Sequence, residues 1–266
     1  MNVIERIFGR PRCLVGVVHV EPLPGSPRWS GGIATVVERA VADATAYERA
    51  GFDGVIIENY GDAPFERGFA GRGAVAGLAA VGAAVRTAIS LPLGVNVLRN
   101  DALSAVAVAA AVGARFIRVN VHTGAAVTDQ GIIEGDAAST LRAIAHDAPD
   151  LTVFADVLVK HAAPLAATTL EREACDAAER GMAAALIVTG EATGAPAELE
   201  HVARIREALP SVPVLVGSGV MPDTVAGTLT VADGVIVGSA VMRGGAGHEV
   251  DEVLASAFAE RARGDV

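Results

Sequence analysis

The sequence predicts an α/β fold, a single (β/α)8 barrel over residues 1–266, and three observations support this prediction. The chain has 266 residues, of which 52% are hydrophobic and 20% charged, so it can bury a large core and falls in the size range of α/β barrels. Eight short apolar runs alternate with segments of helical length. Neither a Pro/Gly/Ser-rich linker nor a change in composition divides the chain, which favours one domain with a short extension over residues 1–12.

The eight apolar runs are the predicted barrel strands, because parallel strands that are covered on both faces read as continuous Val, Ile and Leu segments. In chain order they are Cys13–His19, Gly54–Glu58, Leu93–Val97, Phe116–Asn120, Val153–Val157, Ala185–Thr189, Val214–Gly217 and Gly234–Gly238.

Six of the intervening segments are predicted helices, because their apolar residues recur at helical spacing. They are Val36–Ala50, Asp101–Val112, Asp136–Ala145, Leu170–Arg180, Ala197–Leu209 and Asp251–Arg263. Residues 1–10 are expected to form a further short helix that covers one end of the domain, with a contact to a membrane or a partner as the alternative.

Local signals mark several helix ends. Thr168 and Glu171 have the spacing of a capping box at the start of one helix. Gly51, Gly113 and Gly181 follow predicted helices, at positions where a left-handed residue is expected.

The main alternative is a doubly wound open sheet, and the glycine pattern argues against it. A dinucleotide-binding Gly-x-Gly-x-x-Gly is missing after the first strand, and Gly71 and Gly73 fall in a long loop after the second. A P-loop is excluded because the only lysine, Lys160, follows Val159 rather than a glycine.

Charge and cysteine content limit the partners and the location. With 31 acidic and 21 basic residues the net charge is -10, so we do not expect nucleic acid as a partner. The longest uncharged runs, Ala74–Val85 and Ala102–Ala114, are too short to span a bilayer. Cys13 and Cys175 are too few for a disulfide framework, which favours a reducing, cytoplasmic location.

Polar residues at the predicted strand ends form the candidate site, because chemistry in a barrel lies at the C-terminal ends of the strands. For Glu58, Arg118 and Asp156, an ion-pair network that braces the barrel mouth is an equally good interpretation. The strand-end residues are His19, Glu58, Asn59, Asn96, Arg118, Asn120, His122, Asp156 and Thr189.

Two glycine-serine turns after the last two strands predict a phosphate site. They are Gly217-Ser218-Gly219 and Gly238-Ser239. Glycine lets backbone N–H groups approach an oxyanion, and the start of a following short helix adds the positive end of its dipole. We therefore expect a small phosphorylated ligand, with two ordinary turns as the alternative.

Lys160 is singled out because the chain has 20 arginines and this one lysine. Lysine can lose its proton and arginine cannot, so a unique lysine just after the fifth strand fits a Schiff-base nucleophile, a proton donor or an anion clamp. The alternative is a structural ion pair with Asp156 or Glu58.

Two long loops are expected to enclose the ligand. Val20–Trp29 contains three prolines and the only tryptophan, so it is stiff enough to form a pocket wall. Trp29 fits either stacking on a substrate or a subunit interface. The glycine-rich stretch 59–73 is expected to close as a lid.

We assign no metal ligands. Five residues could converge, but the tandem His-x-His of hydrolytic metal barrels is missing from the first strand. Mg²⁺ bound together with a phosphate is the one cofactor that the sequence leaves open. The five residues are His19, His122, His161, Glu58 and Asp156.

The strand-end residues belong to longer motifs that resemble those of the BtpA family. This resemblance implies a TIM barrel of the ribulose-phosphate-binding type, and it adds Asp62, Arg99 and Asn100 to the candidate residues. The motifs, in the right order from about Leu14 to about Arg243, are His19–Pro27, Glu58–Phe65, Gly94–Asp101, Arg118–Asn120, Ala155–His161, Thr189–Gly190 with Thr193–Gly194, and Gly217–Gly219.

The name of this family comes from a cyanobacterial protein linked to photosystem I assembly or stability and associated peripherally with thylakoid membranes. Relatives in non-photosynthetic bacteria and archaea imply that this role is not general, so the resemblance does not assign a reaction.

Two main hypotheses of function are consistent with these residues. A third is a barrel that binds a ligand without turning it over. The first is an isomerase- or lyase-type enzyme for a small phosphorylated, sugar-like or nucleoside-like metabolite. The second is a non-catalytic assembly or stability factor for photosystem I or another membrane complex, with peripheral membrane association. Either protein is expected to form a homo-oligomer, by analogy with other barrels.

The enzyme hypothesis assigns a role to each candidate residue. The catalytic residues are Asp156, Lys160, Glu58 and His19. The substrate-binding residues are Asn96, Arg99, Arg118, Asn120, Asn59, Asp62 and Thr189, and the phosphate-binding residues are Gly217, Ser218, Gly219, Gly238 and Ser239.

Overall fold

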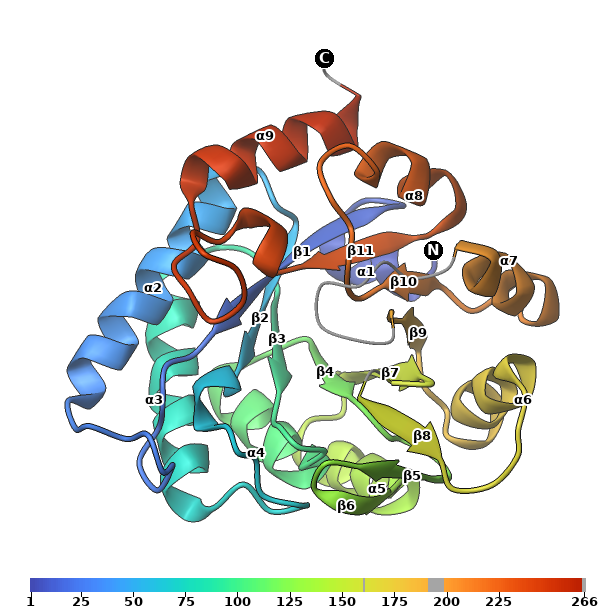
Figure 1. Ribbon diagram of the computed structural model, residues 1–266, viewed down its shortest axis with the longest axis horizontal. Helices are drawn as coiled ribbons and strands as arrows, with labels where there is room; N and C mark the ends of the chain where they lie inside the picture. Colours follow the sequence, from blue (N-terminus) through green and yellow to red (C-terminus); the bar gives the residue numbers. More distant parts are fainter. Residues whose placement is uncertain (160, 191–198, 265–266) are drawn as a thin grey trace.

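A computed structural model describes residues 1–159, 161–190 and 199–264 of the chain. Over these residues, eight parallel strands close into a barrel in the order β1-β11-β10-β9-β7-β4-β3-β2, and the helices surround it (Figure 1). The predicted (β/α)8 barrel is therefore confirmed. Each helix in the described part of the chain is too short or too polar to cross a membrane.

Every predicted barrel strand is present, and each boundary agrees to within one residue. The barrel strands are β1 (Cys13–His19), β2 (Gly54–Glu58), β3 (Leu93–Asn96), β4 (Phe116–Val119), β7 (Thr152–Val157), β9 (Ala185–Val188), β10 (Val214–Val216) and β11 (Gly234–Val237).

The interior of the barrel changes from apolar to polar along several strands. On β4 the inward side chain of Phe116 is followed two residues later by Arg118, and on β7 Phe154 is followed by Asp156. Since alternate residues of a strand point to the same face, the same alternation places Glu58 above Ile56 on β2. The polar residues therefore form the top layer of the barrel interior.

Helices lie between the barrel strands, and the structure adds two that the sequence analysis did not predict. These are α3 (Arg72–Ala88) and α8 (Val225–Val231). Helix α3 buries Ala74, Leu78 and Val81 at helical spacing, but its many small residues resemble a loop in sequence. The others are α1 (Val3–Phe8), α2 (Ile33–Arg49), α4 (Ala102–Val112), α5 (Ala137–Asp147), α6 (Leu170–Cys175) with the π-turn η2 (Asp176–Arg180), α7 (Leu199–Ala208) and α9 (Glu252–Arg263).

Two helix-end predictions need correction. The cap of α6 is Thr169, whose side chain accepts a hydrogen bond from Arg172, so the cap lies one residue after the predicted one. Gly51 and Gly113 have the predicted left-handed conformation, but Gly181 has a φ of -83°. Glycine is needed at 181 because a Cβ there would lie 2.8 Å from Thr123 Cγ2. The predicted start of the helix Ala197–Leu209 lies outside the described residues.

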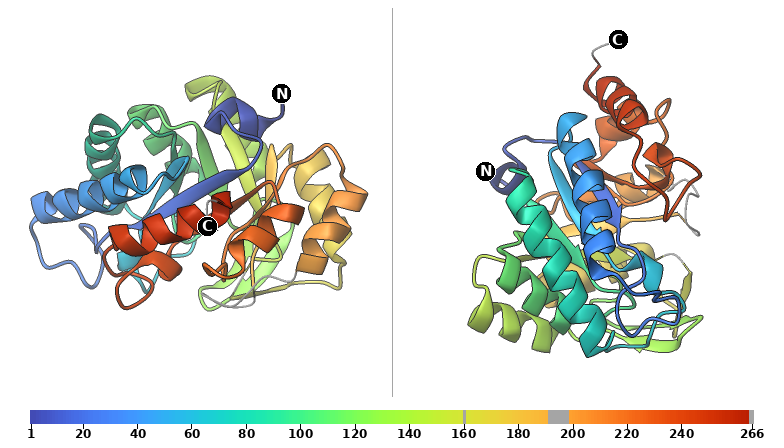
Figure 2. Two further views of the ribbon diagram at one scale, coloured as in Figure 1. Left: turned by 90° about the horizontal axis from the view of Figure 1, so that it is seen from above. Right: turned by 90° about the vertical axis from the view of Figure 1, so that its left-hand side faces the viewer.

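Helix α1 covers the N-terminal end of the barrel, as expected for residues 1–10. Its Phe8 ring lies 5.6 Å from Phe116 and 6.4 Å from Phe154, in edge-on contacts with the lowest layer of the barrel interior. Ile4 is fully buried beside them. Figure 2 shows α1 at one end of the molecule, away from the loops that surround the mouth.

A small antiparallel sheet, which the sequence analysis did not predict, lies at the C-terminal end of the barrel. It consists of β5 (Ala125–Thr128), β6 (Gly131–Glu134) and β8 (Ala162–Pro164), in the order β6-β5-β8. Ala126 and Ile133 on its inner face pack against Val121 and Val159. The sheet therefore roofs the side of the mouth where β4 and β7 end (Figure 1).

Candidate functional site

The register of three neighbouring strands brings His19, Glu58 and Asn96 together at the barrel mouth. His19 pairs with Glu58 across β1 and β2, and Glu58 pairs with Asn96 across β2 and β3. Asn96 Nδ2 donates a hydrogen bond of 2.6 Å to Glu58 Oε2, and Glu58 Oε1 lies 3.9 Å from His19 Nε2. One carboxylate oxygen is thus held by an amide while the other faces an imidazole.

The tautomer of His19 follows from a contact that the sequence analysis missed. The backbone N–H of Gly247 donates a hydrogen bond of 3.0 Å to His19 Nδ1, so neutral His19 carries its hydrogen on Nε2, the nitrogen that faces Glu58. The Tyr60 ring stacks on the imidazole at 4.3 Å. Burial, together with the charge of Glu58, raises the pKa of Tyr60.

Arg118 and Asp156 form a buried ion pair on the floor of the mouth. Arg118 Nη2 lies 2.9 Å from Asp156 Oδ1, and its Nε lies 3.2 Å from both carboxylate oxygens. Asn120 Nδ2 donates a hydrogen bond of 2.6 Å to Asp156 Oδ2. Burial opposes the charge of Arg118, but the carboxylates of Asp156 and Glu58 outweigh it and raise its pKa.

A cavity of about 790 Å³ opens above these residues. Its walls include His19, Glu58, Asn96, Arg118 and Asn120. The volume is typical of small-molecule sites. With Arg99, which also lines it, the structure places six of the predicted site residues around one cavity.

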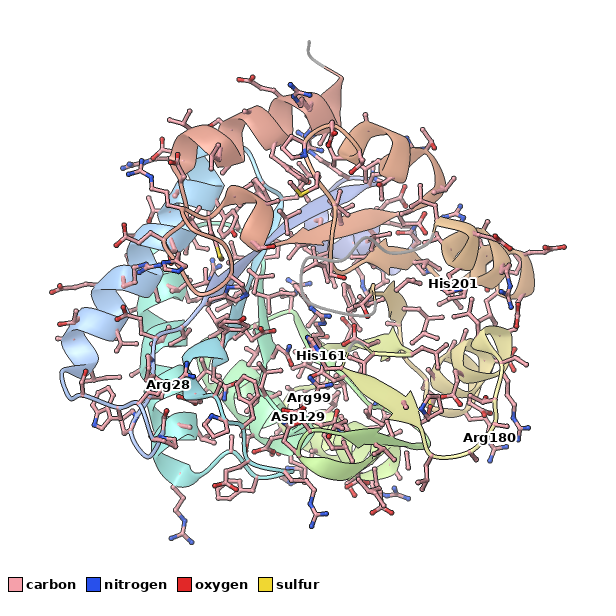
Figure 3. The ribbon with its side chains drawn as sticks, in the orientation of Figure 1. Arg28, Arg99, Asp129, His161, Arg180 and His201 are labelled. Carbon is pink, nitrogen blue, oxygen red and sulfur yellow. The ribbon has the colours of Figure 1, made fainter. Side chains whose placement is uncertain are left out.

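Arg28, Arg99, Asp129 and His161 line the same cavity higher up. In Figure 3, Arg99, Asp129 and His161 lie close together near the ends of β4 and β7, and Arg28 lies on the opposite side. Burial lowers the pKa of Arg99, while the charges of Asp156, Asp129 and Glu58 work against this shift. The rim thus presents basic groups from opposite walls.

The predicted phosphate turns form a narrower recess beside the main cavity. The recess has a volume of about 40 Å³ and is lined by Gly217–Gly219, Gly238 and Ser239, together with the charged or polar side chains of His19, Glu58 and Arg118. A Cβ on Gly217 would lie 2.4 Å from Ile187 Cγ2, so close packing demands glycine there. The expected helix start does not follow the first turn, because α8 begins only at Val225.

Three other predicted residues have structural contacts outside the main cavity. Asn59 Oδ1 accepts a hydrogen bond of 2.7 Å from the backbone N–H of Leu98, and its Nδ2 donates one of 3.0 Å to Asp62. Asp62 also accepts a hydrogen bond of 2.7 Å from the N–H of Leu23. Asn59 and Asp62 therefore brace loops, and Asn100 does the same by bonding to both backbone groups of Val121.

Of the remaining predicted residues, Thr189 and His122 lie away from the main cavity. Thr189 lies beside the first phosphate turn, 3.2 Å from where a Cβ of Gly217 would be. His122 does not join His19, because its Nε2 lies 2.7 Å from the carbonyl oxygen of Gly181 and it lines a different cavity. The described residues contain no group of three His, Cys, Asp or Glu that could hold a metal ion. Lys160 lies outside the described residues, so its predicted role stays a prediction.

A closed parallel barrel with polar residues gathered at its C-terminal end defines a TIM-barrel protein with the usual location for a small-molecule site. Within that class, the chain belongs to the BtpA family, whose model matches residues 10–264. The resemblance drawn from the motifs is thereby confirmed.

Relatives come from bacteria, archaea and animals. The photosystem I biogenesis protein BtpA of Synechocystis is 44% identical over 248 residues, which cover 93% of this chain and 86% of the relative. An uncharacterised protein of Pyrococcus furiosus is 47% identical over 232 residues, 87% of both chains. A mitochondrial uncharacterised protein of Caenorhabditis elegans is 31% identical over 251 residues, 91% of this chain and 90% of that one.

Solved structures share the fold at low sequence identity. Phosphoribosylanthranilate isomerase of Thermotoga maritima aligns with a TM-score of 0.59 and 13% identity, over 95% of this chain and 99% of the other. The native KDPGal structure aligns with a TM-score of 0.59 and 20% identity, over 94% of both chains. At these identities the likeness concerns the fold alone.

Proposed function

We propose that this protein is an enzyme that acts on a small phosphorylated, sugar-like or nucleoside-like metabolite by isomerase- or lyase-type chemistry. One observation carries the proposal: buried Glu58 and Arg118 line a cavity of about 790 Å³, and Arg118 is held there by its ion pair with buried Asp156. A network that only braced the barrel would be expected to fill the space between its members. Buried charged side chains that line an open cavity are typical of catalytic sites.

The acid-base work falls to Glu58 and His19. Glu58 has one oxygen facing His19 Nε2 at 3.9 Å and the other fixed by Asn96. A carboxylate and a neutral imidazole that face one cavity can remove a proton beside a carbonyl and return it to the neighbouring atom. This transfer is the central step of an isomerisation, and it also assists cleavage of a carbon–carbon bond.

Arg118 supplies positive charge for an anion that develops during the reaction. Asp156 and Asn120 hold it in place through the hydrogen bonds described above. The main role of Asp156 in this proposal is therefore to position Arg118, and not to transfer a proton. Lys160 remains in the proposal as a nucleophile or proton donor.

The phosphate group is assigned to the recess formed by the two glycine-serine turns. The phosphoribosylanthranilate isomerases that share the fold act, by name, on a phosphoribosyl compound, which supports this class of substrate. Mg²⁺ would enter the site only together with the phosphate.

The test is a thermal-shift panel of phosphorylated sugars, nucleotides and inorganic phosphate. We expect one group of phosphorylated compounds to raise the melting temperature, since a ligand at 100 times its Kd adds about 2.7 kcal/mol to the free energy of unfolding. Ser239→Asp, which adds a negative charge to the recess, should abolish the shift, and the control Ser239→Ala should retain most of it. A folded protein that responds to none of these compounds contradicts the phosphate assignment.

The second candidate function is an assembly or stability factor, favoured by the name of the Synechocystis relative. Val127 and Ile132 form an exposed apolar pair on the outer face of the antiparallel sheet, with 45% and 44% of their surfaces accessible. In Synechocystis cells that lack BtpA, this function predicts that Val127→Ser with Ile132→Ser abolishes complementation and Glu58→Gln does not. The enzyme proposal predicts the reverse.

Cytoplasmic location and assembly into a homo-oligomer also remain proposals. Cell fractionation tests the first, and sedimentation analysis of the purified protein tests the second.

A further inference from the structure

The recess of the two glycine-serine turns shares part of its wall with the main cavity. His19, Glu58 and Arg118 line both spaces. In the proposed function, Glu58 and His19 transfer the proton and Arg118 stabilises the anion that develops. A phosphate group in the recess therefore lies beside the atoms that react, and not at the far end of a long substrate.

Distances at the two turns support this closeness. A Cβ on Gly238 would lie 3.2 Å from His19 Cε1 and 3.5 Å from His19 Nε2, so the second turn comes within one methyl group of the imidazole edge that faces Glu58. A Cβ on Gly217 would lie 3.3 Å from Arg118 Nη2. Each turn is thus a close neighbour of a residue that acts on the substrate.

The size and the floor of the recess hold a phosphate at this level. A volume of about 40 Å³ gives room for about three water-sized groups, which suits a phosphate group but not a sugar ring. Val17 and Ile236 line the recess from below, because they precede His19 and Gly238 by two residues and point to the same face. The rest of a ligand therefore has its room in the main cavity.

Charge decides how a phosphate ester is oriented in the recess. Among the described residues of its lining, Arg118 is basic and Glu58 is acidic. Arg118 and the backbone N–H groups of the turns attract the charged oxygens of a phosphate, and Glu58 repels them. The bridging ester oxygen carries the least negative charge, so the repulsion is smallest when this oxygen faces Glu58. The first carbons of the substrate then point toward Glu58 and His19.

We propose that the substrate carries its phosphate ester on a carbon bonded directly to its carbonyl carbon, as in the 1-phosphate of a ketose. This inference rests on the proposed function and narrows its substrate class. With the phosphate in the recess, the carbonyl oxygen of such a compound lies within reach of the Nε2–H of His19. In the 6-phosphate of the same ketohexose, three further carbons separate the carbonyl from the ester, which carries the carbonyl past Glu58 and His19.

Hydroxyacetone phosphate is the probe, because it contains the phosphate ester and the neighbouring carbonyl without the rest of a sugar. Propyl phosphate is its matched control, since it lacks only the carbonyl oxygen. We expect hydroxyacetone phosphate to bind about tenfold more tightly, the size expected for one added hydrogen bond. In 4-oxopentyl phosphate the carbonyl is two carbons further from the ester, so this compound should bind like propyl phosphate.

Binding is followed at the ring nitrogens of His19 by long-range ¹H–¹⁵N NMR in labelled protein, at an ionic strength held constant with potassium chloride. The Nε2 resonance should move saturably with inorganic phosphate and further with hydroxyacetone phosphate. His122 is the internal control, because its Nε2 is bonded to the carbonyl oxygen of Gly181 and it lines a different cavity. Its resonances should stay in place.

A pair of glycine variants tests the contact between turn and imidazole. Gly238→Ala adds a methyl group 3.2 Å from His19 Cε1, where the recess meets the main cavity, and should weaken the binding of hydroxyacetone phosphate about tenfold, the size expected for the loss of one good contact. Gly227→Ala is the control, because a Cβ there meets nothing within 4 Å, and it should bind like the wild type.

The outcomes separate this inference from the proposed function. If inorganic phosphate binds but hydroxyacetone phosphate binds no better than propyl phosphate, the position of the carbonyl is wrong and the phosphate assignment stands. The same holds if the phosphates bind without moving His19, or bind equally well to Gly238→Ala and Gly227→Ala. If none of the phosphates binds to the folded protein, the phosphate assignment fails and this inference fails with it.

Discussion

His19 is oriented by parts of the chain that lie far apart in sequence. Gly247 donates to its Nδ1, Tyr60 covers its ring, and Glu58 faces its Nε2. Gly247 has a φ of 85° and a Cβ there would lie 3.2 Å from Tyr60. Only glycine fits this position easily. The loop after η3 (Ser239–Val241) therefore needs Gly247 to donate its N–H to His19 Nδ1 and so to fix the tautomer of His19.

This contact predicts an N–H···N hydrogen bond that NMR can detect directly. Scalar coupling across the bond should connect the amide nitrogen of Gly247 with His19 Nδ1. His122 is the control in the same spectrum, since its Nε2–H points to a carbonyl oxygen and gives no such coupling. A protonated Nδ1 on neutral His19 would contradict the tautomer and, with it, the proton donor assigned to the site.

His122 predicts a pH dependence of stability. Burial lowers its pKa in the folded state, below the value of about 6.5 expected in the unfolded chain. As the pH falls below about 6.5, the unfolded chain therefore binds the proton first, and stability present at higher pH is lost until the pH passes the folded pKa.

The comparison is between the wild type and His122→Gln, whose amide keeps a donor for the carbonyl oxygen of Gly181. The melting temperature should fall further between pH 7.5 and pH 5.5 for the wild type than for the variant. Equal falls in the two proteins would mean that this imidazole titrates as freely when folded as when unfolded.

At the scale of elements, α1 packs against the N-terminal end of the barrel and closes it. Phe8 contacts Phe116 and Phe154, and a Cβ on Gly54 would lie 2.6 Å from the Phe8 ring. Its apolar face is buried in the barrel, which argues against α1 as a contact for a membrane or partner.

Phe8→Ala should therefore lower the free energy of unfolding by about 3–5 kcal/mol, the cost of truncating a buried aromatic side chain. Urea denaturation measures it, with Arg6→Ala on the exposed side of α1 as the control. A similar small loss in both variants would show that α1 is not part of the core.

The sequence predicted the barrel strands well because both of their faces are buried, which leaves an apolar run that ends at a polar residue. Helix α3 was missed because Ala and Gly hide its amphipathic pattern. The antiparallel sheet was missed because β8 follows β5 only after the whole of α5 and β7, and strands of three or four residues carry little pattern.

The same division holds for the candidate site: residues on the barrel strands were predicted, and their partners in loops were not. His19, Glu58 and Asn96 end barrel strands, and Arg118 and Asp156 lie one residue before the ends of theirs, so strand register brings these residues together at the mouth. The partners that set their chemistry, such as Gly247 and Tyr60, come from loops, and loop contacts across 228 residues leave no local signal in the sequence.

At the scale of the whole molecule, stability and site share one structure. The lower layers of the barrel interior are apolar and sealed by α1, while the top layer is charged and open to the main cavity. Burying the charges of the top layer costs desolvation free energy, and the hydrogen bonds within the layer reduce that cost. This arrangement is the central reason to expect catalysis here.

Turnover by Glu58→Gln tests that claim most directly. The phosphorylated compound that gives the largest thermal shift would be incubated with the wild type and with the variant, and its conversion followed by ³¹P NMR. The enzyme account predicts that the wild type converts it, and that the variant still binds it but converts it about 10²–10⁴-fold more slowly, as for loss of a general acid-base group. A wild type that binds the compound without changing it, or a variant that converts it equally fast, would contradict the account.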